Sequence, residues 1–516
     1  MGLSASGRPA GGLAERVTAR RAALLWLAAA LISGFTMRRY LEPFDEGLLL
    51  QAATRVADGE WPFADFGWGY GPGQPLLIAL AFKVFGPSVV WWRIVRVAAD
   101  ATTAVLVWHL TGRAAGPRWA LAAWFAAAVT AAQPTSANPS SVALALALAA
   151  VAIAVGGRGD RTVSGRRAAT AGAVAALAAF WRADFGAVAV AAVVVVLLVR
   201  RDARAALVAA ATALAAGLVL YLPFAIAAGP GELWDTFVAG PAREGEFWTL
   251  PFPLTYDGPL HGLGDLKDLL VYELPLIGVI ALAAALLTLA VRRRAAAIFA
   301  GLAVIALGTA IYLRSRADEQ HAQPLLIIAC ALIPVALATR PPRALAAILA
   351  AALALIAAGG AANRVSALVK PPDLEPVRLA GVPGIRVPPA EAAALPPLVR
   401  SVQQLVPPGE PIYVAPRRSD LVTLTNPLLH FLTRRPNVLR DDVLLQAKPD
   451  EQARIVAALE RARPKAIVRW TDPISARPEP NPRGRPSGST ELDRYLAEAY
   501  RLHARYGRYD VLVPRD

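Results

Sequence analysis

Long apolar runs separated by short polar connections make up most of the chain between residues 22 and 362. A helix that crosses the hydrocarbon core of a membrane needs about 20 apolar residues, and several of the runs reach that length. Most runs hold no charged residue in their interior, so the pattern predicts about eleven transmembrane helices. We expect them at residues 22–37, 89–111, 118–132, 139–155, 168–181, 185–199, 205–228, 269–291, 295–313, 324–338 and 343–362.

The pattern changes after residue 362, where prolines become frequent and short apolar segments alternate with amphipathic ones. Compact apolar segments are typical of buried strands, and a period of about 3.6 is typical of helices. We expect strands at 411–415, 466–470 and 509–513, helices at 450–463 and 490–506, a Ser489 cap on the second helix, and a mobile loop at 473–489. The predicted fold class is an all-α polytopic membrane bundle of about 11 transmembrane helices, followed by a small C-terminal α/β soluble domain.

Basic residues outnumber acidic ones by 53 to 38, which gives a formal net charge of +15. The arginines lie in alternate connections between the apolar runs, and the cytoplasmic loops of membrane proteins carry such an excess. These connections hold Arg113 and Arg118; Arg158, Arg161, Arg166 and Arg167; Arg200, Arg201 and Arg204; Arg292 to Arg294; and Arg340 and Arg343. The charge therefore indicates an orientation in a membrane, and we expect no nucleic-acid partner.

This alternation predicts a multi-pass protein of the inner (cytoplasmic) membrane with a cytoplasmic N-terminus. An odd number of spans then places the C-terminal segment on the extracytoplasmic face. We expect a cytoplasmic N-terminal tail at 1–21, a transmembrane domain at 22–362 with an outer loop at 38–88, and an extracytoplasmic C-terminal domain at 363–516. The other outer loops are 133–138, 182–184, 229–268 and 314–323.

Recognisable cofactor motifs are absent from the sequence. It contains no Walker loop, no dinucleotide-type glycine fingerprint, no HExxH and no Cys/His spacing typical of a metal site. The single cysteine, Cys330, lies inside an apolar run, so no disulfide can form within the chain. We therefore expect no cofactor, and the metal requirement stays open.

Two adjacent acids, Asp45 and Glu46, follow the first apolar run. An amphipathic segment comes next, and then an aromatic stretch that contains Asp65 and Tyr70. Acids in this position can be solvated loop charges, or carboxylates that a helix dipole favours at a helix N-terminus. They can equally belong to a site at the membrane surface, and the residues alone leave these explanations open.

The order of these features resembles one family. The chain is similar to the GT-C superfamily of polyprenyl-phosphate-sugar-dependent membrane glycosyltransferases. The similarity lies in the order of a first span, an acidic dyad, an amphipathic segment, the stretches PFADF and YGP, and an Arg93-bearing second span after Phe85-Gly86. The pattern is near that of the protein O-mannosyltransferase and lipid A aminoarabinose transferase branch, and the resemblance extends over the whole chain. The HPP stretch of the mannosyltransferases is replaced by Gly71-Pro72-Gly73-Gln74-Pro75, which leaves the subfamily and the acceptor open.

Glycosyl transfer from a polyprenyl phosphate needs one base. The leaving group is already a stabilised anion, so a single carboxylate that activates the acceptor is enough, and attack opposite the departing phosphate inverts the anomeric carbon. The resemblance implies that an acid of this loop is the base, and Asp45 matches the first acid of the family's dyad. We predict Asp45 as the catalytic base with Glu46 second, and Asp65 and Tyr70 as pocket residues.

The departing phosphate needs fixed positive charge near the hydrocarbon boundary. Arg182 lies in an outer turn, where a charge is costly unless it is paired or used, so it either binds the phosphate or closes a helix hairpin with Asp184. Residues 314–321 combine arginines, acids and a histidine, which indicates a donor contact or simple anchoring to headgroups. We predict the donor-phosphate ligands Arg182, Arg316 and His321 and the pocket residues Asp184 and Asp318.

Three functions fit these features: inverting transfer of a sugar from a polyprenyl phosphate to an acceptor at the outer face, secondary transport, and non-catalytic assembly of the cell envelope. A transporter favours ionisable residues at the membrane midplane, whereas here they crowd one face. An assembly protein needs no acidic dyad beside basic residues. We therefore expect a glycosyltransferase whose partners are the lipid-linked donor, the bilayer and an acceptor that is a glycan, a lipid or a protein.

Overall fold

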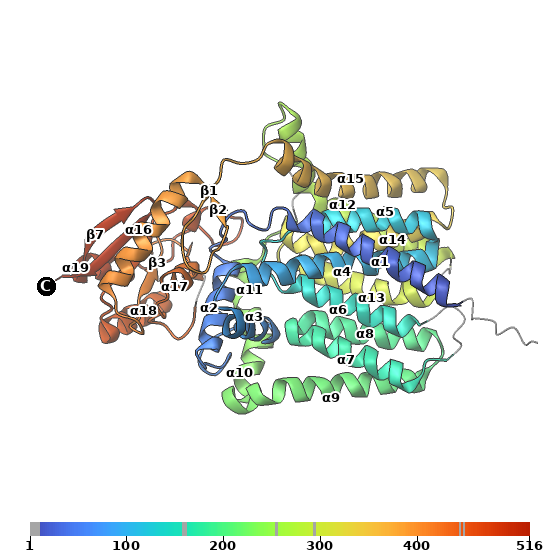
Figure 1. Cartoon of the computed structure of the whole chain (residues 1–516), viewed down its shortest axis with the longest axis horizontal. Helices are drawn as coiled ribbons and strands as arrows, with labels where there is room; N and C mark the ends of the chain where they lie inside the picture. Colours follow the sequence, from blue (N-terminus) through green and yellow to red (C-terminus); the bar gives the residue numbers. More distant parts are fainter. Residues whose placement is uncertain are drawn as a thin grey trace, which may run out of the picture.

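The apolar runs form a bundle of helices that lie side by side (Figure 1). The computed structural model describes residues 11–156, 162–252, 256–292, 296–442, 445–446 and 449–515. The bundle helices are α1 (Gly11–Gly34), α4 (Val90–Ala115), α5 (Pro117–Ala131), α6 (Ser140–Val155), α7 (Gly165–Trp181), α8 (Ala183–Val199), α9 (Ala203–Ala228), α12 (Leu263–Arg292), α13 (Ala296–Ser315), α14 (Glu319–Leu337) and α15 (Arg343–Val369). Within the described residues, α4, α9, α12, α13, α14 and α15 are the 6 helices long and apolar enough to cross a membrane. The chain is a multi-pass membrane protein.

Each expected span coincides with a helix, although several helix ends differ from the prediction. Helix α14 begins at Glu319, earlier than predicted, because the Asp318 side chain caps it by accepting a hydrogen bond from the His321 backbone N–H. Helix α15 runs past residue 362 and ends just before Pro371, which disfavours a helical conformation of the residue before it. Hydropathy placed the start of α14 too late and the end of α15 too early, because the polar residues at these ends still belong to the helices.

The two ends of the bundle differ in composition. The segments predicted to share the outer side, among them α2 (Asp45–Ala57), α3 (Gly73–Phe85), α10 (Pro230–Trp234), η1 (Asp235–Ala239) and α11 (Gly240–Trp248), gather at the end that faces the C-terminal region (Figure 1). The arginine-rich connections lie at the other end. Four of their predicted arginines, Arg158, Arg161, Arg293 and Arg294, lie outside the described residues, as do residues 1–10 of the predicted tail.

Small residues let the bundle helices approach closely. Helices α7 and α9 touch at Gly172, where a Cβ atom would lie 2.1 Å from the carbonyl oxygen of Ala209. In the α7–α8 hairpin, a Cβ atom on Gly186 would lie 2.2 Å from the Cα atom of Ala179. Contact between small residues is a common basis of helix packing in membranes. The Gly186 contact fixes the turn that carries Arg182.

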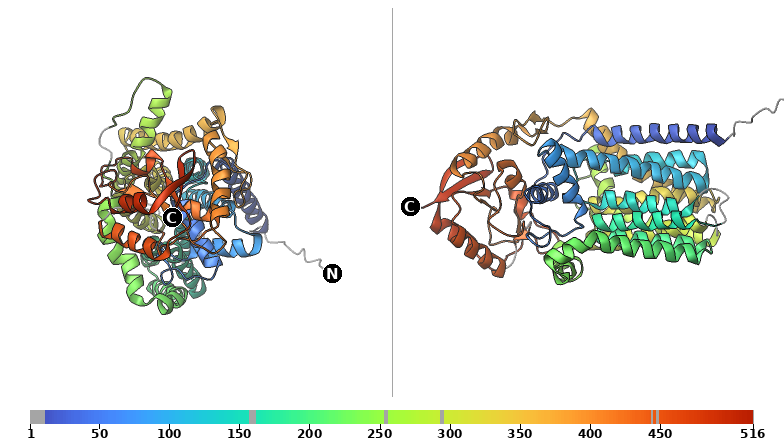
Figure 2. Two further views of the ribbon diagram at one scale, coloured as in Figure 1. Left: turned by 90° about the vertical axis from the view of Figure 1, so that its left-hand side faces the viewer. Right: turned by 60° about the horizontal axis from the view of Figure 1, so that its bottom comes forward.

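The C-terminal region, residues 370–515, is built around a four-stranded mixed sheet (Figure 2). The strand order is β3 (Tyr413–Ala415), β6 (Ile467–Trp470), β8 (Tyr509–Pro514) and β7 (Tyr500–Tyr506). Strands β3 and β6 are parallel, whereas β8 is antiparallel to both of its neighbours. The region also contains α16 (Pro389–Leu405), α17 (Leu428–Thr433), α18 (Pro449–Ala462), α19 (Glu491–Ala499), η2 (Pro473–Ala476), and the pairs β1 (Glu375–Pro376) with β2 (Arg386–Val387) and β4 (Thr423–Leu424) with β5 (Leu445–Gln446). The three predicted strands are present.

The helix predicted at 490–506 is wrong in its second half. Helix α19 ends at Ala499, and the following residues form strand β7, which pairs with β8 across a tight turn. Gly507 in this turn has a φ of 56°, in the left-handed region that glycine adopts without strain. Pairing with the sheet therefore outweighs the helical pattern of this segment, as tertiary contacts often do.

Helix α2 lies between the bundle and the C-terminal region (Figure 2). Leu50 of α2 is fully buried in an apolar core that also contains Leu398 of α16 and Leu428 of α17. A Cβ atom on Gly47 would lie 2.5 Å from the backbone nitrogen of Leu428, so α2 touches α17 directly. This packing fixes the first turn of α2, which carries the acidic dyad.

Candidate active site

Side chains from four separate connections converge at the end of the bundle that faces the C-terminal region. They are Asp45 at the start of α2, Tyr70 before α3, Arg182 between α7 and α8, and Arg316, Asp318 and His321 at the junction of α13 and α14. The charges of His321, Arg182, Asp318 and Arg316 all act on the carboxyl group of Asp45, and the charge of Asp45 acts on Tyr70. The structure thus brings together most of the residues predicted from the sequence.

Asp45 is the central carboxylate of this cluster. It is half-buried, and among the described residues its side chain has no hydrogen-bond partner. Burial raises the pKa of Asp45 above its ordinary value, while the charges of His321 and Arg182 oppose the rise. A carboxylate with its oxygens unoccupied and a raised pKa is suited to accept a proton from a bound molecule.

Arg182 places its guanidinium charge near enough to act on that carboxyl group. Its Nε donates to the two carboxylate oxygens of Asp184 at 2.9 and 3.1 Å, and its Nη1 donates to Asn138 Oδ1 at 3.2 Å. The guanidinium carbon lies 4.4 Å from the ring centroid of Tyr312 and 5.3 Å from that of Tyr70. The predicted pair with Asp184 therefore forms. No described residue accepts from Nη2, so part of this rigid donor set is available to an anion.

Asp318 and His321 form a second polar pair. His321 Nδ1 lies 2.7 Å from Asp318 Oδ1, and its ring packs 5.1 Å from the ring of Tyr312. Burial alone raises the pKa of Asp318, but hydrogen bonds and charge from His321, together with Arg316, lower it to about 2. The carboxylate is therefore ionised at neutral pH and accepts the Nδ1 proton. This contact orients His321 and leaves its Nε2 for another partner.

Arg316 connects the bundle to the C-terminal region. Its Nε donates to Asp318 at 2.6 Å, and its Nη2 and Nη1 donate to the two carboxylate oxygens of Glu479 at 3.0 and 3.2 Å. Arg483 donates to the same Glu479 at 2.7 Å. The loop at 473–489, which the sequence predicted to be mobile, is therefore held against the bundle. Arg316 lies beside the cluster, but its donors are largely occupied.

Glu46 lies in a different environment from Asp45. Its side chain and that of Arg93 are both 0% exposed, and Arg93 Nε and Nη2 each donate to one Glu46 oxygen at 2.7 Å. Arg93 also donates to the carbonyl oxygens of Met37 and Tyr40 at 2.7 and 2.8 Å. A buried carboxylate with both oxygens bound in this way holds the chain together. The geometry therefore gives Glu46 a structural partner and no access to the cluster.

Glu42 was not identified from the sequence. Its two carboxylate oxygens accept the backbone N–H groups of Phe44 and Glu46 at 2.9 and 2.8 Å, so it caps the first turn of α2. Burial, with the nearby charge of Asp45, raises the pKa of Glu42 to about 8. An acid just before Pro43 was a signal for such a cap, because a carboxylate is favoured at a helix N-terminus.

The remaining predicted pocket residues separate into two groups. Burial and the charge of Asp45 raise the pKa of Tyr70, whose ring lies within the cluster. Asp65 instead is exposed, and its carboxylate accepts the Trp61 backbone N–H at 2.7 Å within its own loop. No described contact joins Asp65 to the cluster, so its predicted role as a pocket residue has no support in this geometry.

Two members of the cluster were missed because neither is charged and neither belongs to a recognisable motif. Tyr312 belongs to α13 and covers Arg182, and Asn138 lies at the end of the connection between α5 and α6. Asn138 Nδ2 donates to the Tyr312 hydroxyl oxygen at 3.2 Å. Only the three-dimensional packing of the helices shows that these side chains surround the same arginine.

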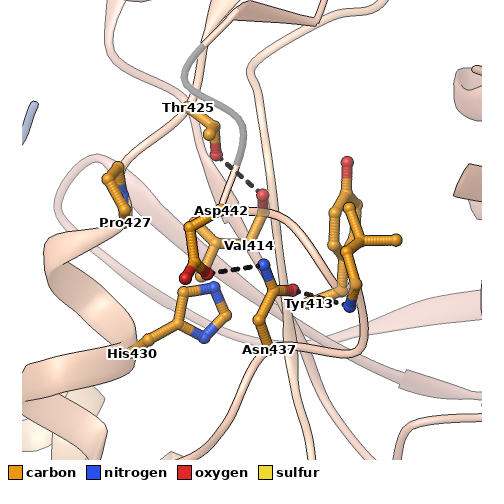
Figure 3. Close-up of a pocket in the computed structure, with 8 residues that line it drawn as sticks. Tyr413, Val414, Thr425, Pro427, His430, Asn437 and Asp442 are labelled. Carbon is orange, nitrogen blue, oxygen red and sulfur yellow. Dashed lines mark hydrogen bonds between the residues drawn. The ribbon is translucent and has the colours of Figure 1, made fainter. Parts of the chain in front are cut away.

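A pocket in the C-terminal region is too small for a ligand. Figure 3 shows His430 and Asp442 facing each other there, with Asn437 donating to Asp442 at 2.9 Å. The pocket has a volume of about 10 Å³, roughly that of one water molecule. Burial lowers the pKa of His430 to about 4, and Asp442 pairs with Arg55 of α2 at 3.3 Å. This cluster therefore ties the C-terminal region to α2.

Within the described residues, no group of three or more His, Cys, Asp and Glu side chains could hold a metal ion.

Over nearly the whole chain, the fold is similar to those of solved GT-C membrane glycosyltransferases. The crystal structure of ArnT from Cupriavidus metallidurans in the apo state aligns with 98% of this chain and 98% of its own, with a TM-score of 0.57 at 14% identity. The arabinofuranosyltransferase AftD from Mycobacteria aligns over 96% of this chain and 40% of its own, with a TM-score of 0.53 at 15% identity. The Archaeoglobus fulgidus oligosaccharyltransferase aligns over 86% of this chain and 67% of its own, with a TM-score of 0.51 at 13% identity. No family model and no curated protein sequence matches the chain.

The resemblance found in the sequence is therefore confirmed for the fold. All three of these solved structures are less than 16% identical to this chain, so their likeness shows a common architecture. The reaction has to be argued from the site.

Proposed function

We propose that the protein transfers a sugar from a polyprenyl phosphate to an acceptor, with inversion at the anomeric carbon and Asp45 as the base. The acceptor is a glycan, a lipid or a protein. The observation that carries this proposal is the contrast around Asp45. Its carboxylate has no hydrogen-bond partner among the described residues, and it lies among cationic and aromatic side chains that are themselves held in place.

The reaction needs one proton transfer and one displacement. Asp45 takes the proton of the acceptor hydroxyl group, and the acceptor oxygen forms a bond to the anomeric carbon. The bond from this carbon to the phosphate oxygen breaks on the opposite face, and its electron pair leaves with the polyprenyl phosphate. No general acid is needed because the leaving group is a phosphate anion. The raised pKa of Asp45 makes it a better base than an ordinary aspartate.

Arg182 and His321 are the groups that we assign to the phosphate. Arg182 is held by Asp184, Asn138 and aromatic rings, so it pays little conformational entropy when an anion binds. Asp318 orients His321 in the same way. Arg316, which the sequence predicted as a third ligand, donates to Glu479 and Asp318 in this geometry. We assign it the positioning of Asp318 and of the loop that carries Glu479.

A transfer assay on the purified protein tests this proposal. We expect release of free polyprenyl phosphate from at least one of a panel of radiolabelled polyprenyl-phosphate sugars, in the presence of membranes that supply acceptors. Asp45→Asn protein should bind the same donor without turnover. Labelled donor that binds but is instead moved across the bilayer of proteoliposomes, with no bond broken, would replace the transferase with a transporter.

The orientation in the membrane is part of the proposal, because the donor and the acceptor have to meet at the face that carries Asp45. We place the N-terminus in the cytoplasm and the C-terminal region outside, in accord with the loop arginines. Thr162 and Ala497 are exposed at opposite ends of the molecule, and Cys330 is buried. An impermeant maleimide should label Ala497→Cys in intact cells and label Thr162→Cys only after permeabilisation. The reverse pattern would contradict an outer site.

A further inference from the structure

A cavity of about 470 Å³ lies beside the candidate active site. Its walls come from the connection between α1 and α2, the connection between α5 and α6, the first turn of α14, and the last turns of α15 with the residues just after it. It borders the active site through Glu42 and through the start of α14, but Asp45, Arg182 and His321 do not line it. The cavity is therefore a separate space whose chemistry the proposed transfer does not use.

Two guanidinium groups converge in this cavity, and neither forms a direct ion pair with a described residue. The guanidinium carbons of Arg39 and Arg364 lie 5.8 and 5.7 Å from the centroid of the same Phe35 ring. Each contacts a neutral oxygen: Arg39 Nη1 donates to the Ala367 carbonyl at 3.0 Å, and Arg364 Nη1 donates to Thr36 Oγ1 at 2.9 Å. Arg364 Nε is buried and has no hydrogen-bond partner among the described residues. Two like charges held against one ring favour an anion between them.

The acidic residues of the cavity form no direct ion pair with these cations among the described residues. The oxygens of Glu42 accept backbone N–H groups in the first turn of α2. Glu319 accepts a hydrogen bond from Asn363 at 3.3 Å, and its charge acts on Arg364 without direct contact. Lys370 adds a third positive charge, and none of the three cations forms an ion pair with a described residue. Three cations with no direct ion pair are costly near a membrane unless they are used.

The surroundings of the cavity indicate a lipid. Exposed apolar side chains lie close in sequence to the cations: Leu31 in α1 and Phe35 just after it, and Leu368 and Val369 at the end of α15. In a bundle that crosses a membrane, such side chains contact acyl chains, and cations at the ends of spans lie at the level of the headgroups. Arginine pairs with phosphate oxygens through its parallel N–H donors.

We propose that this cavity is a second anion site, in which Arg39, Arg364 and Lys370 bind the phosphate group of a membrane lipid whose chains lie along Leu31 and Leu368. The phosphate can belong to a polyprenyl carrier or to a phospholipid, and both present the same chemistry to the cavity. The site does not include Asp45, so it can be tested independently of the transfer reaction.

Cysteine protection tests the site directly. Ser366 lines the cavity, and the native Cys330 is buried, so Ser366→Cys protein carries one accessible thiol. Its modification by a neutral maleimide is measured in detergent with two matched pairs of lipids: dioleoyl phosphatidate against dioleoylglycerol, and a long-chain polyprenyl phosphate against the corresponding polyprenol. We expect the phosphate-bearing member of at least one pair to slow labelling by about tenfold, and the neutral members to have little effect.

The pattern of protection also identifies the source of the phosphate. Protection by polyprenyl phosphate alone indicates a carrier site, and protection by phosphatidate alone indicates a phospholipid site. Equal protection by the neutral lipids, or no protection by any lipid, would overturn the proposal. The same measurement on Asp45→Asn protein should give unchanged protection, which separates this site from the catalytic one.

Charge-removing variants identify the ligands. In the Ser366→Cys background, Arg364→Gln should raise the lipid concentration that gives half protection by about tenfold. Arg343→Gln, an exposed arginine at the opposite end of α15, is the matched control and should have no effect. Since Arg364 is partly buried, Lys370→Gln provides a second test at an exposed position. Full protection in both Arg364→Gln and Lys370→Gln proteins would remove these cations from the site.

Discussion

Asp45 and Glu46 are neighbours in the sequence, yet their surroundings are opposite. Glu46 is fully buried and bound on both oxygens by Arg93, whereas the Asp45 side chain has no hydrogen-bond partner in the described part of the chain and faces the Arg182 and His321 cluster. Consecutive residues of a helix point about 100° apart, so the first turn of α2 directs one carboxylate into the protein core and the other toward the cluster. The same chemical group therefore serves folding on one side of α2 and is available for chemistry on the other.

The largest effect is expected at Asp45. The Asp45→Asn change keeps the shape of the side chain and removes its ability to accept a proton, so turnover should fall by about 10²- to 10⁴-fold. Donor affinity and the yield of folded protein should stay close to those of the wild type, because Asp45 forms no hydrogen bond that holds the fold. The measurement is kcat at saturating donor with matched amounts of protein. Normal turnover in this variant would remove the general base from the mechanism.

Glu46 should respond in the opposite way. The Glu46→Gln change leaves the buried Arg93 charge without its counter-ion, and breaking such a pair costs about 3 to 5 kcal/mol of stability. Thermal unfolding in detergent should show the loss as a lower midpoint. The control is Glu410→Gln, which breaks an exposed pair with Lys465 that contributes less than about 1 kcal/mol.

The Glu46 and Asp45 variants should also differ in the turnover of the protein that folds. Folded Glu46→Gln protein that survives purification should keep most of its turnover per molecule. A stable but inactive Glu46→Gln protein, together with an active Asp45→Asn protein, would exchange the two roles.

A smaller effect should separate the two arginines that border Asp45. The Nη2 group of Arg182 donates to no described residue, whereas Arg316 donates to Asp318 and Glu479. Loss of one charge-assisted contact to phosphate costs roughly 1.5 to 3 kcal/mol, so Arg182→Gln should weaken donor binding by about tenfold or more. Arg316→Gln should weaken it by less. An equal loss in both variants would indicate that the donor phosphate displaces Glu479 from Arg316 when it binds.

How far this contrast could be predicted from the sequence depends on how far apart in the chain the contacting residues lie. Apolar runs predict helices because burial in lipid requires them, and loops that alternate across the membrane predict which segments share an end. That reasoning was sufficient to select Asp45, Arg182 and His321 as neighbours. It could not show that Arg93 of α4 reaches Glu46, because that contact depends on how α2 enters the core.

Long-range pairing explains the other differences. Glu479 meets Arg316 only when the C-terminal region folds back on the bundle, and no local pattern in the loop at 473–489 indicates this contact. Strand β7 continues directly from α19, and its helical pattern is overridden by the ladder with β8. In each case, the local sequence is compatible with two structures and a distant partner decides between them.

The smallest effect is a shift in the pH dependence of turnover. Burial raises the pKa of Asp45 above its ordinary value of 3.8, and the charges of His321 and Arg182 limit that rise. The base acts only when it is ionised, so turnover should decline as the pH falls through this raised pKa. Removing the positive charge of Arg182 takes away an influence that lowers the pKa, so the acidic limb of kcat/KM should move to higher pH.

The control for this shift is Arg440→Gln, an exposed arginine whose described contacts are with Glu232, Asp441 and the loop before α3. Its acidic limb should coincide with that of the wild type. The direction of the Arg182→Gln shift is the decisive part, because a general loss of stability would lower turnover at every pH without moving the limb upward. A limb that stays in place while donor binding weakens would mean that Arg182 binds the phosphate but that a group other than Asp45 sets the pH dependence.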